Sequence, residues 1–278
     1  MAVLNSWQRI DRVLSGKPFG DGADRNATIS SDPNTRQSCS GASAQKNLTI
    51  ASGAFSNGDV VLIHQSRGTG AGQWEINRIA SGGGTTTLVM QKDLHYTYTD
   101  SGASQAQVMN IPRYDNLTVS NFTVTAWDGN TGGTLVLAAK SEITVTGTIS
   151  GVGKGFVGGA KGGDWADSYQ GEGTSGAGTT STTANGNGGG GGDAHSPDAL
   201  PGGGGGGHGA AGTAGQNILS YSGGAGGGVA GSADLITAVF GGAGGGGTEN
   251  SGGVASRGGS GGALVFMFCN NVVIDGTI

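Results

Sequence analysis

The sequence predicts an all-β protein whose β-rich N-terminal part is followed by a glycine-rich bundle. Short runs rich in Val, Ile and Thr recur between residues 45 and 150, bounded by Gly, Asn, Asp or Ser, with no long helical period. Residues 151–262 then hold 44 of the 62 glycines. We therefore expect three parts: an attachment segment (1–40), a β-rich scaffold (41–150) and a glycine-rich domain closed by a returning strand (151–278).

A short amphipathic helix is expected at the N-terminus. Asn5 or Ser6 can cap it, Gly16 can end it, and apolar side chains recur at helical spacing at Leu4, Trp7, Ile10, Val13 and Leu14. Such a helix either packs on its own domain or docks on a partner subunit. The segment lacks the basic start, apolar stretch and cleavage site of a secretory signal.

The β-rich part is expected to form a β-sandwich or a β-solenoid. A turn-rich stretch, 19–32, leads into a first short strand. The strands that follow come at regular intervals, and several alternate apolar and polar residues, which is typical of half-buried strands; they are expected within 47–55, 58–65, 74–80, 85–94, 116–127, 133–139 and 142–149.

A repeat encloses the glycine-rich part. "GGTLVLAAKSEITVTGTI" (132–149) and "GGALVFMFCNNVVIDGTI" (261–278) align without gaps at a spacing of 129 residues. They predict two equivalent rungs, between which the glycine-rich segment leaves and returns. A rung ending at Ile278 would be completed by more chain or by a neighbouring molecule. We therefore expect a homo-oligomer, with head-to-tail assembly as one arrangement, or contact with other subunits of a particle or filament.

The glycine-rich part is either a slack tether or an ordered framework. Its charged residues are sparse, both its ends join matching strands, and it contains two apolar clusters, around Ile218–Tyr221 and Leu235–Phe240. These features favour order. Extended glycine chains with three residues per turn can approach one another on all sides, because no Cβ intervenes, and can bond backbone to backbone. The sequence thus predicts a polyglycine-II-like bundle.

Such a framework must present its chemistry at its turns. Polar stretches are expected to form these tips at 164–187, 193–201, 208–222 and 247–257. Aromatic and amide side chains suit recognition of sugars or protein surfaces. The candidate binding residues are Trp165, Tyr169, His195, His208 and Tyr221, although ordinary loops would have the same composition.

Motifs for catalysis, metals or cofactors are weak. Ser260 in "GGSGG" matches a nucleophile pattern that a glycine tract produces by chance, and "GVGKG" around Lys154 is not a phosphate loop. The four histidines show no zinc spacing, and His64 is expected to be a satisfied core or edge residue. We expect no catalytic residue, no metal and no cofactor. Hydrolysis of a polysaccharide needs two carboxylates that face each other across the substrate. The sequence does not say which carboxylates face each other; the candidates are Asp59, Glu75, Asp93, Asp100 and Asp115.

Charge and composition limit the partners. The net charge is −5, charged residues are 12%, and no basic stripe is present, so nucleic acid is not an expected partner. No apolar run is long enough to span a membrane. Cys39 and Cys269 either pair or remain free thiols. Candidate glycosylation sequons lie at Asn26, Asn47, Asn116 and Asn121.

The chain resembles glycine-rich phage tail-fibre and adhesin proteins. The resemblance lies in "FGDGADRNATISSD" (19–32), "GDVVLIHQSRGTGAGQWEINRI" (58–79) and "GTISGVGKGFVGG" (147–159) with the glycine tracts that follow. It implies a structural or attachment role, with a host surface glycan or protein as ligand. The leading hypothesis is a non-enzymatic tail-fibre component of a phage virion. The alternative is a subunit of a bacterial or archaeal extracellular filament or adhesin; a polysaccharide-degrading enzyme is a third class.

Overall fold

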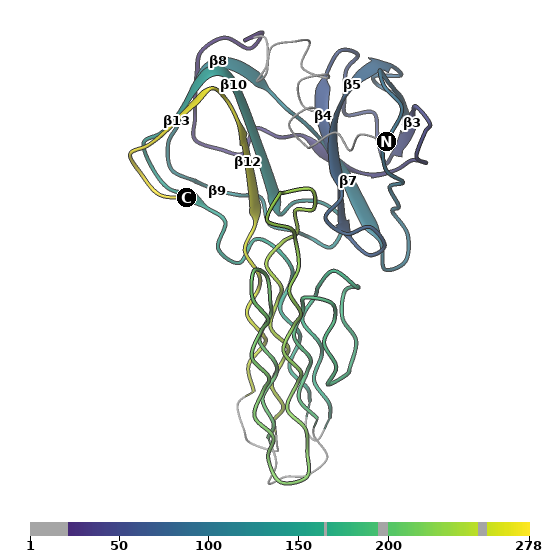
Figure 1. Cartoon of the computed structure of the whole chain (residues 1–278), viewed down its shortest axis with the longest axis vertical. Helices are drawn as coiled ribbons and strands as arrows, with labels where there is room; N and C mark the ends of the chain where they lie inside the picture. The colour runs from purple at the N-terminus through teal and green to yellow at the C-terminus, as the bar shows by residue number, and fades with distance from the viewer. Residues whose placement is uncertain (1–21, 164–165, 194–199, 250–254) are drawn as a thin grey trace.

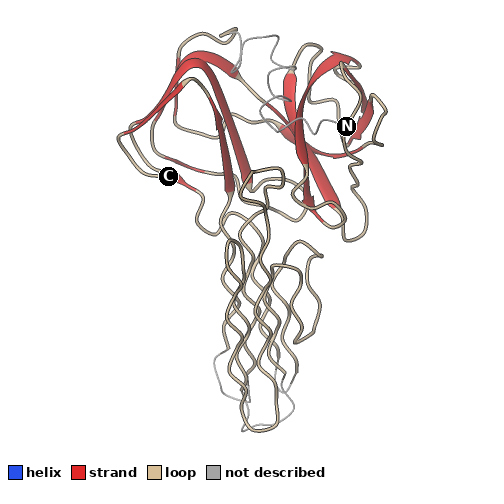
Figure 2. Ribbon diagram, viewed as in Figure 1, coloured by secondary structure: helices blue, strands red, loops and turns tan. Residues whose placement is uncertain are grey.

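The computed structural model describes residues 22–163, 166–193, 200–249 and 255–278. Within these ranges the regular elements are all strands, so the all-β prediction is confirmed (Figure 2). The helix predicted over Leu4–Leu14 lies outside the described residues. None of the described segments forms a helix long and apolar enough to cross a membrane.

Six antiparallel strands close into a barrel. Its order is β2 (Arg36–Ser40), β3 (Asn47–Ile50), β6 (Thr87–Met90), β5 (Trp74–Ser81), β4 (Val60–Arg67) and β7 (Gln105–Asn110). Alternation along β4 sorts its side chains, because successive residues of a strand point to opposite faces. Val61 and Ile63 pack in one cluster with Leu48 and Leu88, whereas Val60 and Leu62 pack in another with Trp74 and Val136.

The remaining strands pair in parallel and form a stack beside the barrel (Figure 1). The order is β1 (Ala27–Ile29), β8 (Arg113–Val119), β10 (Thr134–Val145) and β12 (Leu264–Phe268), with β13 (Asn271–Ile274) also on β10. A smaller pair joins β9 (Phe122–Thr123) to β11 (Ile149–Ser150). Since the strands are in register, equivalent residues form columns, and Leu117, Ile143 and Val272 make one of them.

The repeat found in the sequence brings β10 beside its own copy. Glu142 pairs with Asn271, at the same 129-residue spacing as the repeat, whereas Thr134 pairs with Leu264, one residue further on. The two halves of the second copy are thus offset by one residue against β10. The strand pattern predicted a sandwich or a solenoid, and the closed barrel is a form that it did not predict.

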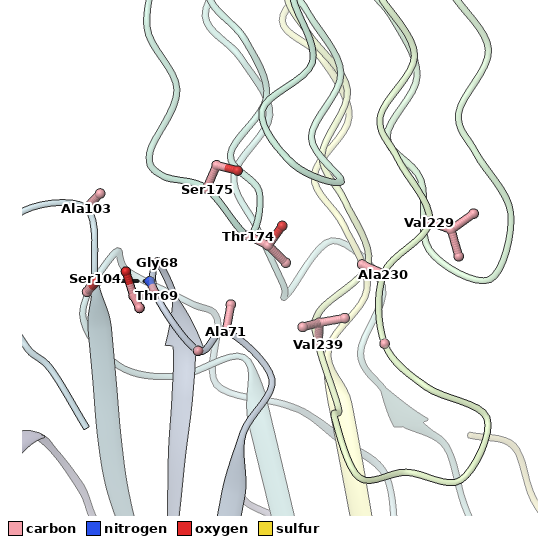
Figure 3. Close-up of a pocket in the computed structure, with 12 residues that line it drawn as sticks. Gly68, Thr69, Ala71, Ala103, Ser104, Thr174, Ser175, Val229, Ala230 and Val239 are labelled. Carbon is pink, nitrogen blue, oxygen red and sulfur yellow. Dashed lines mark hydrogen bonds between the residues drawn. The ribbon is translucent and has the colours of Figure 1, made fainter. Parts of the chain in front are cut away.

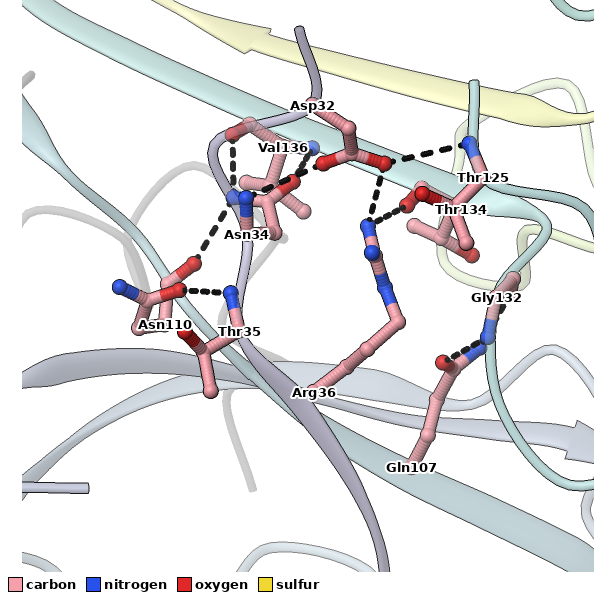
Figure 4. A network of polar contacts seen from close by, with 10 residues as sticks. All are labelled: Asp32, Asn34, Thr35, Arg36, Gln107, Asn110, Thr125, Gly132, Thr134 and Val136. Atoms are coloured by element: carbon pink, nitrogen blue, oxygen red, sulfur yellow. Dashed lines mark hydrogen bonds and ion pairs between the residues drawn. The ribbon is translucent and has the colours of Figure 1, made fainter. Parts of the chain in front are cut away.

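Polar side chains attach the segment that leads into β2 to the barrel and to the parallel stack (Figure 4). The Asn34 amide donates to the carbonyls of Asn110 and Val136, at 2.9 Å each, and its Oδ1 accepts from the Val136 N–H. Arg36 forms an ion pair with Asp32 at 2.8 Å. Both polar atoms of the Asn34 side chain are satisfied, so this segment fixes the barrel against β10.

The glycine-rich region (155–262) extends away from the barrel as segments that run back and forth side by side (Figure 1). Backbone hydrogen bonds join neighbouring segments, and bonds to the same neighbour recur every third residue. Gly242 donates to Gly207 at 2.9 Å, and Gly245 donates to Gly204 at 2.8 Å. Side chains contribute little to this interior, because most contacts run from main chain to main chain.

One glycine illustrates how close the segments lie. Gly204 donates to the Gly190 carbonyl and accepts from the Gly245 N–H, both at 2.8 Å. A Cβ on Gly204 would lie 2.1 Å from the Ala225 oxygen. Gly204 is therefore enclosed by three different segments, and only a residue without a side chain fits there.

Candidate functional site

The predicted binding residues are not brought together. Trp165 and His195 lie outside the described residues. Tyr221 is half-buried in the 217–221 turn. This turn lies at the end of the glycine-rich region away from the barrel (Figure 1). Tyr169 is 46% exposed. His208 is exposed at the opposite end, near the barrel, where it lines a hollow of about 390 Å³. His208 and Tyr221 therefore lie at opposite ends of the glycine-rich region, and a binding role for either of them stays a prediction.

The 217–221 turn is the tip that the structure describes. Ile218 and Tyr221 exchange backbone hydrogen bonds at 3.1 Å, which closes the turn. Leu219, with a φ of 56°, projects from it and is 76% exposed. The Asn217 side chain accepts from the Gly223 N–H at 2.8 Å. An apolar and an aromatic side chain on a braced turn suit contact with a surface.

A cleft of about 600 Å³ opens where the barrel meets the glycine-rich region (Figure 3). Barrel loops 68–71 and 103–104 form one wall, and residues 174–175, 229–231 and 239 form the other. Gly68 donates to the Thr174 carbonyl at 2.8 Å and joins the walls at the base. Its lining consists of small, hydroxyl and aliphatic residues without an ionisable side chain, so it offers shape and neutral hydrogen bonds but no acid or base.

Sequence reasoning missed this cleft because its walls come from separate parts of the chain. Thr69 lies between β4 and β5, whereas Ser104 directly precedes β7, and the Ser104 hydroxyl accepts from the Thr69 N–H at 3.1 Å. Gly68, Gly70 and Gly72 all have φ near +80° to +90°, so the loop itself could have been predicted as a tight glycine turn. The residues of the glycine-rich region that face this loop could not have been predicted from the sequence.

A buried carboxylate lies behind the cleft. Glu172, in the glycine-rich region, accepts from the Arg67 guanidinium of the barrel and from Trp127 Nε1 at 2.9 Å. Its second oxygen accepts from the Val157 N–H at 3.0 Å. The Arg67 and Glu172 side chains are 7% and 4% exposed. Their charges are paired and hydrogen-bonded, so this cluster joins the two parts and is not free for chemistry.

His64 is a satisfied core residue, as predicted. Its Nε2 donates to the Ala238 carbonyl at 2.8 Å, so its Nδ1 accepts from the Ser66 hydroxyl at 2.9 Å. Burial lowers the pKa of His64 to about 4, and the hydrogen bond to Ala238 opposes this shift only in part. The neutral ring therefore links β4 to the returning segment of the glycine-rich region.

One of the carboxylates weighed for hydrolysis, Glu75, is held in the barrel by hydrogen bonds. Glu75 is buried and accepts from the His95 N–H at 2.7 Å, and burial raises the pKa of its carboxyl. Among the described residues no group of three or more His, Cys, Asp or Glu side chains could hold a metal ion. The Ser260 hydroxyl accepts from the Gly158 N–H at 3.2 Å.

The disulfide considered between Cys39 and Cys269 is not formed. Both thiols are free, since Cys39 lies in the barrel core and Cys269 packs against the parallel stack. Burial raises the pKa of both. Of the sequon asparagines, Asn26 and Asn116 bond to each other, Asn121 accepts from the Thr148 N–H, and Asn47 is exposed on β3.

Comparison with known proteins adds little. No family model matches the chain, and no curated protein matches it. One solved structure with partial similarity is the Gp54 tailspike of Acinetobacter baumannii bacteriophage AP22, in complex with A. baumannii capsular saccharide. The similarity has a TM-score of 0.25 and 14% sequence identity, and it covers 45% of this chain and 27% of the tailspike. The chain thus spans about a quarter of that protein, and likeness at this level carries no functional argument.

Proposed function

We propose that this chain is a non-enzymatic structural and adhesive protein of a phage virion, a component of a tail fibre. In this proposal the N-terminal segment attaches it to the particle, and the barrel with the parallel stack is the scaffold. The glycine-rich region is a polyglycine-II-like bundle that carries binding loops away from the scaffold. A host surface glycan or protein is the ligand.

The observation that carries the proposal is the backbone pairing of the glycine-rich region. Hydrogen bonds recurring every third residue are what chains with three residues per turn require. Gly241, Gly244 and Gly247 donate in turn to Gly262, Gly259 and Ser256, at 3.1, 2.9 and 3.0 Å. Fixing the backbone of each residue opposes folding by about 1–2 kcal/mol. An ordered region with this many glycines therefore indicates selection for a thin, stiff projection.

Adhesion is assigned to the 217–221 turn because this turn combines an exposed side chain with a fixed backbone. At the described tip, Leu219 and Tyr221 stand on a turn closed by main-chain bonds. Loops on a rigid scaffold are where binding residues concentrate, since the scaffold reduces the entropy lost on binding.

Imaging the native assembly with an antibody against the purified chain tests this function. A label on the fibres of phage particles supports the proposal. A free helical polymer of this chain would instead establish the bacterial or archaeal filament subunit. Release of reducing sugars from host glycans by the purified chain would contradict the non-enzymatic assignment.

A binding assay tests the tip separately. The purified chain is applied to host cells as wild type, as Leu219→Ser with Tyr221→Ser, and as Val152→Ser. Val152 is 85% exposed and lies outside the described tip, so its replacement is a matched control. Binding should fall at least about tenfold in the tip variant only, as expected for loss of apolar contact groups. Equal binding by all three would remove this turn from the adhesive surface.

A further inference from the structure

A hollow of about 530 Å³ opens on the barrel between two walls, one from residues 40–49 and one from residues 97–101. β3 forms part of the first wall and lies on the side of the barrel away from the parallel stack (Figure 1). Leu48 packs in the barrel core, so Asn47 and Thr49 face the hollow, because successive residues of a strand point to opposite sides. We call this feature the barrel hollow. It shares no lining residue with the cleft beside the glycine-rich region.

The backbone of both walls is held in place. Gly41 and Tyr98, one from each wall, exchange backbone hydrogen bonds at 3.0 and 2.8 Å. The Gln65 side chain is 0% exposed and spends its amide on the second wall. Its Oε1 accepts from the Thr99 N–H at 2.8 Å, and its Nε2 donates to the Thr99 carbonyl at 3.0 Å. A buried side chain of the barrel thus fixes the backbone directly before Asp100.

Several side chains that project from these walls take no part in holding the fold together. Among the described residues, the side chains of Gln45, Asn47 and Asp100 form no hydrogen bond. Other amides of the barrel brace its loops, as Asn57 does by accepting from the Gly83 N–H at 2.7 Å. Polar groups that stabilise no loop and stand on a fixed backbone are available to a ligand, and little ordering is left to oppose its binding.

The lining indicates the chemistry of that ligand. Asp100 is the one carboxylate among the described residues that line the hollow, and no lysine, arginine or histidine is among them. An anionic ligand would therefore meet an unbalanced negative charge. Ala42 is the one aliphatic side chain of the lining, and the aromatic Tyr98 is 1% exposed, so an apolar ligand would find few contacts. The groups that remain are amides, hydroxyls and a carboxylate.

We propose that the barrel hollow binds an uncharged glycan. Asp100 accepts hydrogen bonds from two adjacent sugar hydroxyls, since each carboxylate oxygen is an acceptor. Gln45 and Asn47 bond the neighbouring hydroxyls, because an amide both donates and accepts, as a hydroxyl does. The volume of the hollow lies within the range of about 300–1,000 Å³ that is usual for small-ligand sites. Hydrolysis would need a second facing carboxylate, so this site binds a glycan without cleaving it.

This inference goes beyond the proposed function, because it gives the barrel a ligand of its own. The 217–221 turn lies at the far end of the glycine-rich region, so the two sites are separate (Figure 1). A chain that binds glycan in the barrel hollow but is absent from phage fibres would keep this site and lose the proposed function. A chain found on fibres whose barrel binds no glycan would do the reverse.

An array of immobilised oligosaccharides, probed with the full-length chain, tests the class of ligand. The array presents uncharged hexose and N-acetylhexosamine oligosaccharides beside sialylated and uronic-acid-containing ones. The chain should bind members of the uncharged set, and titration calorimetry then gives the Kd of the strongest. Binding to none of the uncharged glycans, or to anionic glycans alone, would overturn the proposal.

Two substitutions locate the site. Asp100→Asn keeps the shape of the side chain and removes its charge, and Asn47→Ala removes an amide. Each should weaken binding of the selected glycan at least about tenfold, because a hydrogen bond to the ligand is weakened or lost. The matched control is Asp115→Asn, an exposed carboxylate on the parallel stack, which should bind like wild type. Thermal melting monitors folding, and unchanged binding by both hollow variants would refute the site.

Hydrogen exchange with the selected glycan provides a second readout that needs no substitution. Amides of 41–50 and 97–101 should exchange more slowly when the glycan is added, whereas amides of the 217–221 turn should not change. Protection confined to the 217–221 turn would assign the glycan to the tip and overturn the barrel site.

Discussion

Gly245 and Gly259 differ in what a methyl group would meet, although both lie in the glycine-rich region. A Cβ on Gly245 would lie 1.9 Å from the Gly190 oxygen, whereas a Cβ on Gly259 would have no atom within 4 Å. Neither has a positive φ, so steric space alone separates them. The glycines are therefore not interchangeable. Some positions require glycine because a neighbouring backbone lies too close for a Cβ, whereas others have room for a side chain.

Alanine at these two positions should therefore have opposite effects. Gly245→Ala should lower the free energy of unfolding by about 2 kcal/mol or more, because backbone must shift to admit the methyl group. Gly259→Ala should be neutral or stabilise by up to about 1 kcal/mol, because it restricts the unfolded chain. Urea denaturation measures both. Equal tolerance of the two substitutions would contradict the close packing of these segments.

His64 should make the fold sensitive to acid. Its pKa is about 4 in the folded state, against an ordinary value of 6.5, so its contribution to stability is fully present above pH 6.5 and is lost as pH falls toward 4. The loss amounts to about 3 kcal/mol over this window. The raised pKa of Glu75 acts in the opposite direction, because the folded state then takes up that proton more readily.

The measurement is the free energy of unfolding against pH for wild type and His64→Gln. The variant should lose part of the slope between pH 6.5 and 4, even if its stability is lower throughout. Parallel curves for the two proteins would show that the ring is already charged or exposed.

Between elements, Glu172 joins parts of the chain that share no strand pairing. Arg67 ends β4, Trp127 follows β9, and Val157 begins the glycine-rich region, and all three donate to this carboxylate. Phe156 and Phe240 pack beside Trp127 in one small core cluster. This ion pair and this aromatic cluster thus add to the hydrogen bonds from Gly68 to Thr174 and from His64 to Ala238, which also join the barrel to the glycine-rich region.

Breaking the ion pair from one side should be costly. Glu172→Gln should lower the free energy of unfolding by about 3–5 kcal/mol, because it leaves the Arg67 charge buried and unpaired. Adding Arg67→Met should recover part of the loss. Asp115→Asn is the control, since the Asp115–Lys140 pair is largely exposed, and no measurable change is expected. Additive losses in the double variant would show that the two charges do not interact.

The whole molecule combines two kinds of interior. Side chains fill the cores of the barrel and the stack, whereas backbone fills most of the glycine-rich region. Three apolar clusters fill the barrel, the stack and the contact between them. Beyond the cluster at Trp127, the described interior of the glycine-rich region is mostly backbone. The cleft of about 600 Å³ lies at the change from one kind of interior to the other.

Amide exchange checks this division. Gly190, Gly204, Gly224 and Gly245 should exchange as slowly as Leu62 in the barrel, because each N–H is bonded to a neighbouring segment. Leu219, on the exposed turn, should exchange quickly. Rapid exchange throughout 151–262 would mean that the region is a slack tether and would end the proposed function as well.

The sequence by itself determined the all-β class, the adjacency of the two repeat copies and the burial of His64, because each follows from a local period or a direct repetition of residues. The sequence analysis missed β2 and β7, because both strands are rich in polar residues although they belong to the barrel. Gln107 in β7 is buried because its amide is satisfied by Ser66 and Gly132. Only the tertiary structure decided the closed barrel, the two free cysteines, the partners of Glu172, the cleft and the separation of His208 from Tyr221. Each of these depends on pairings between residues far apart in the chain, which local patterns do not encode, since any polar residue or glycine has many equivalent partners until the fold selects one.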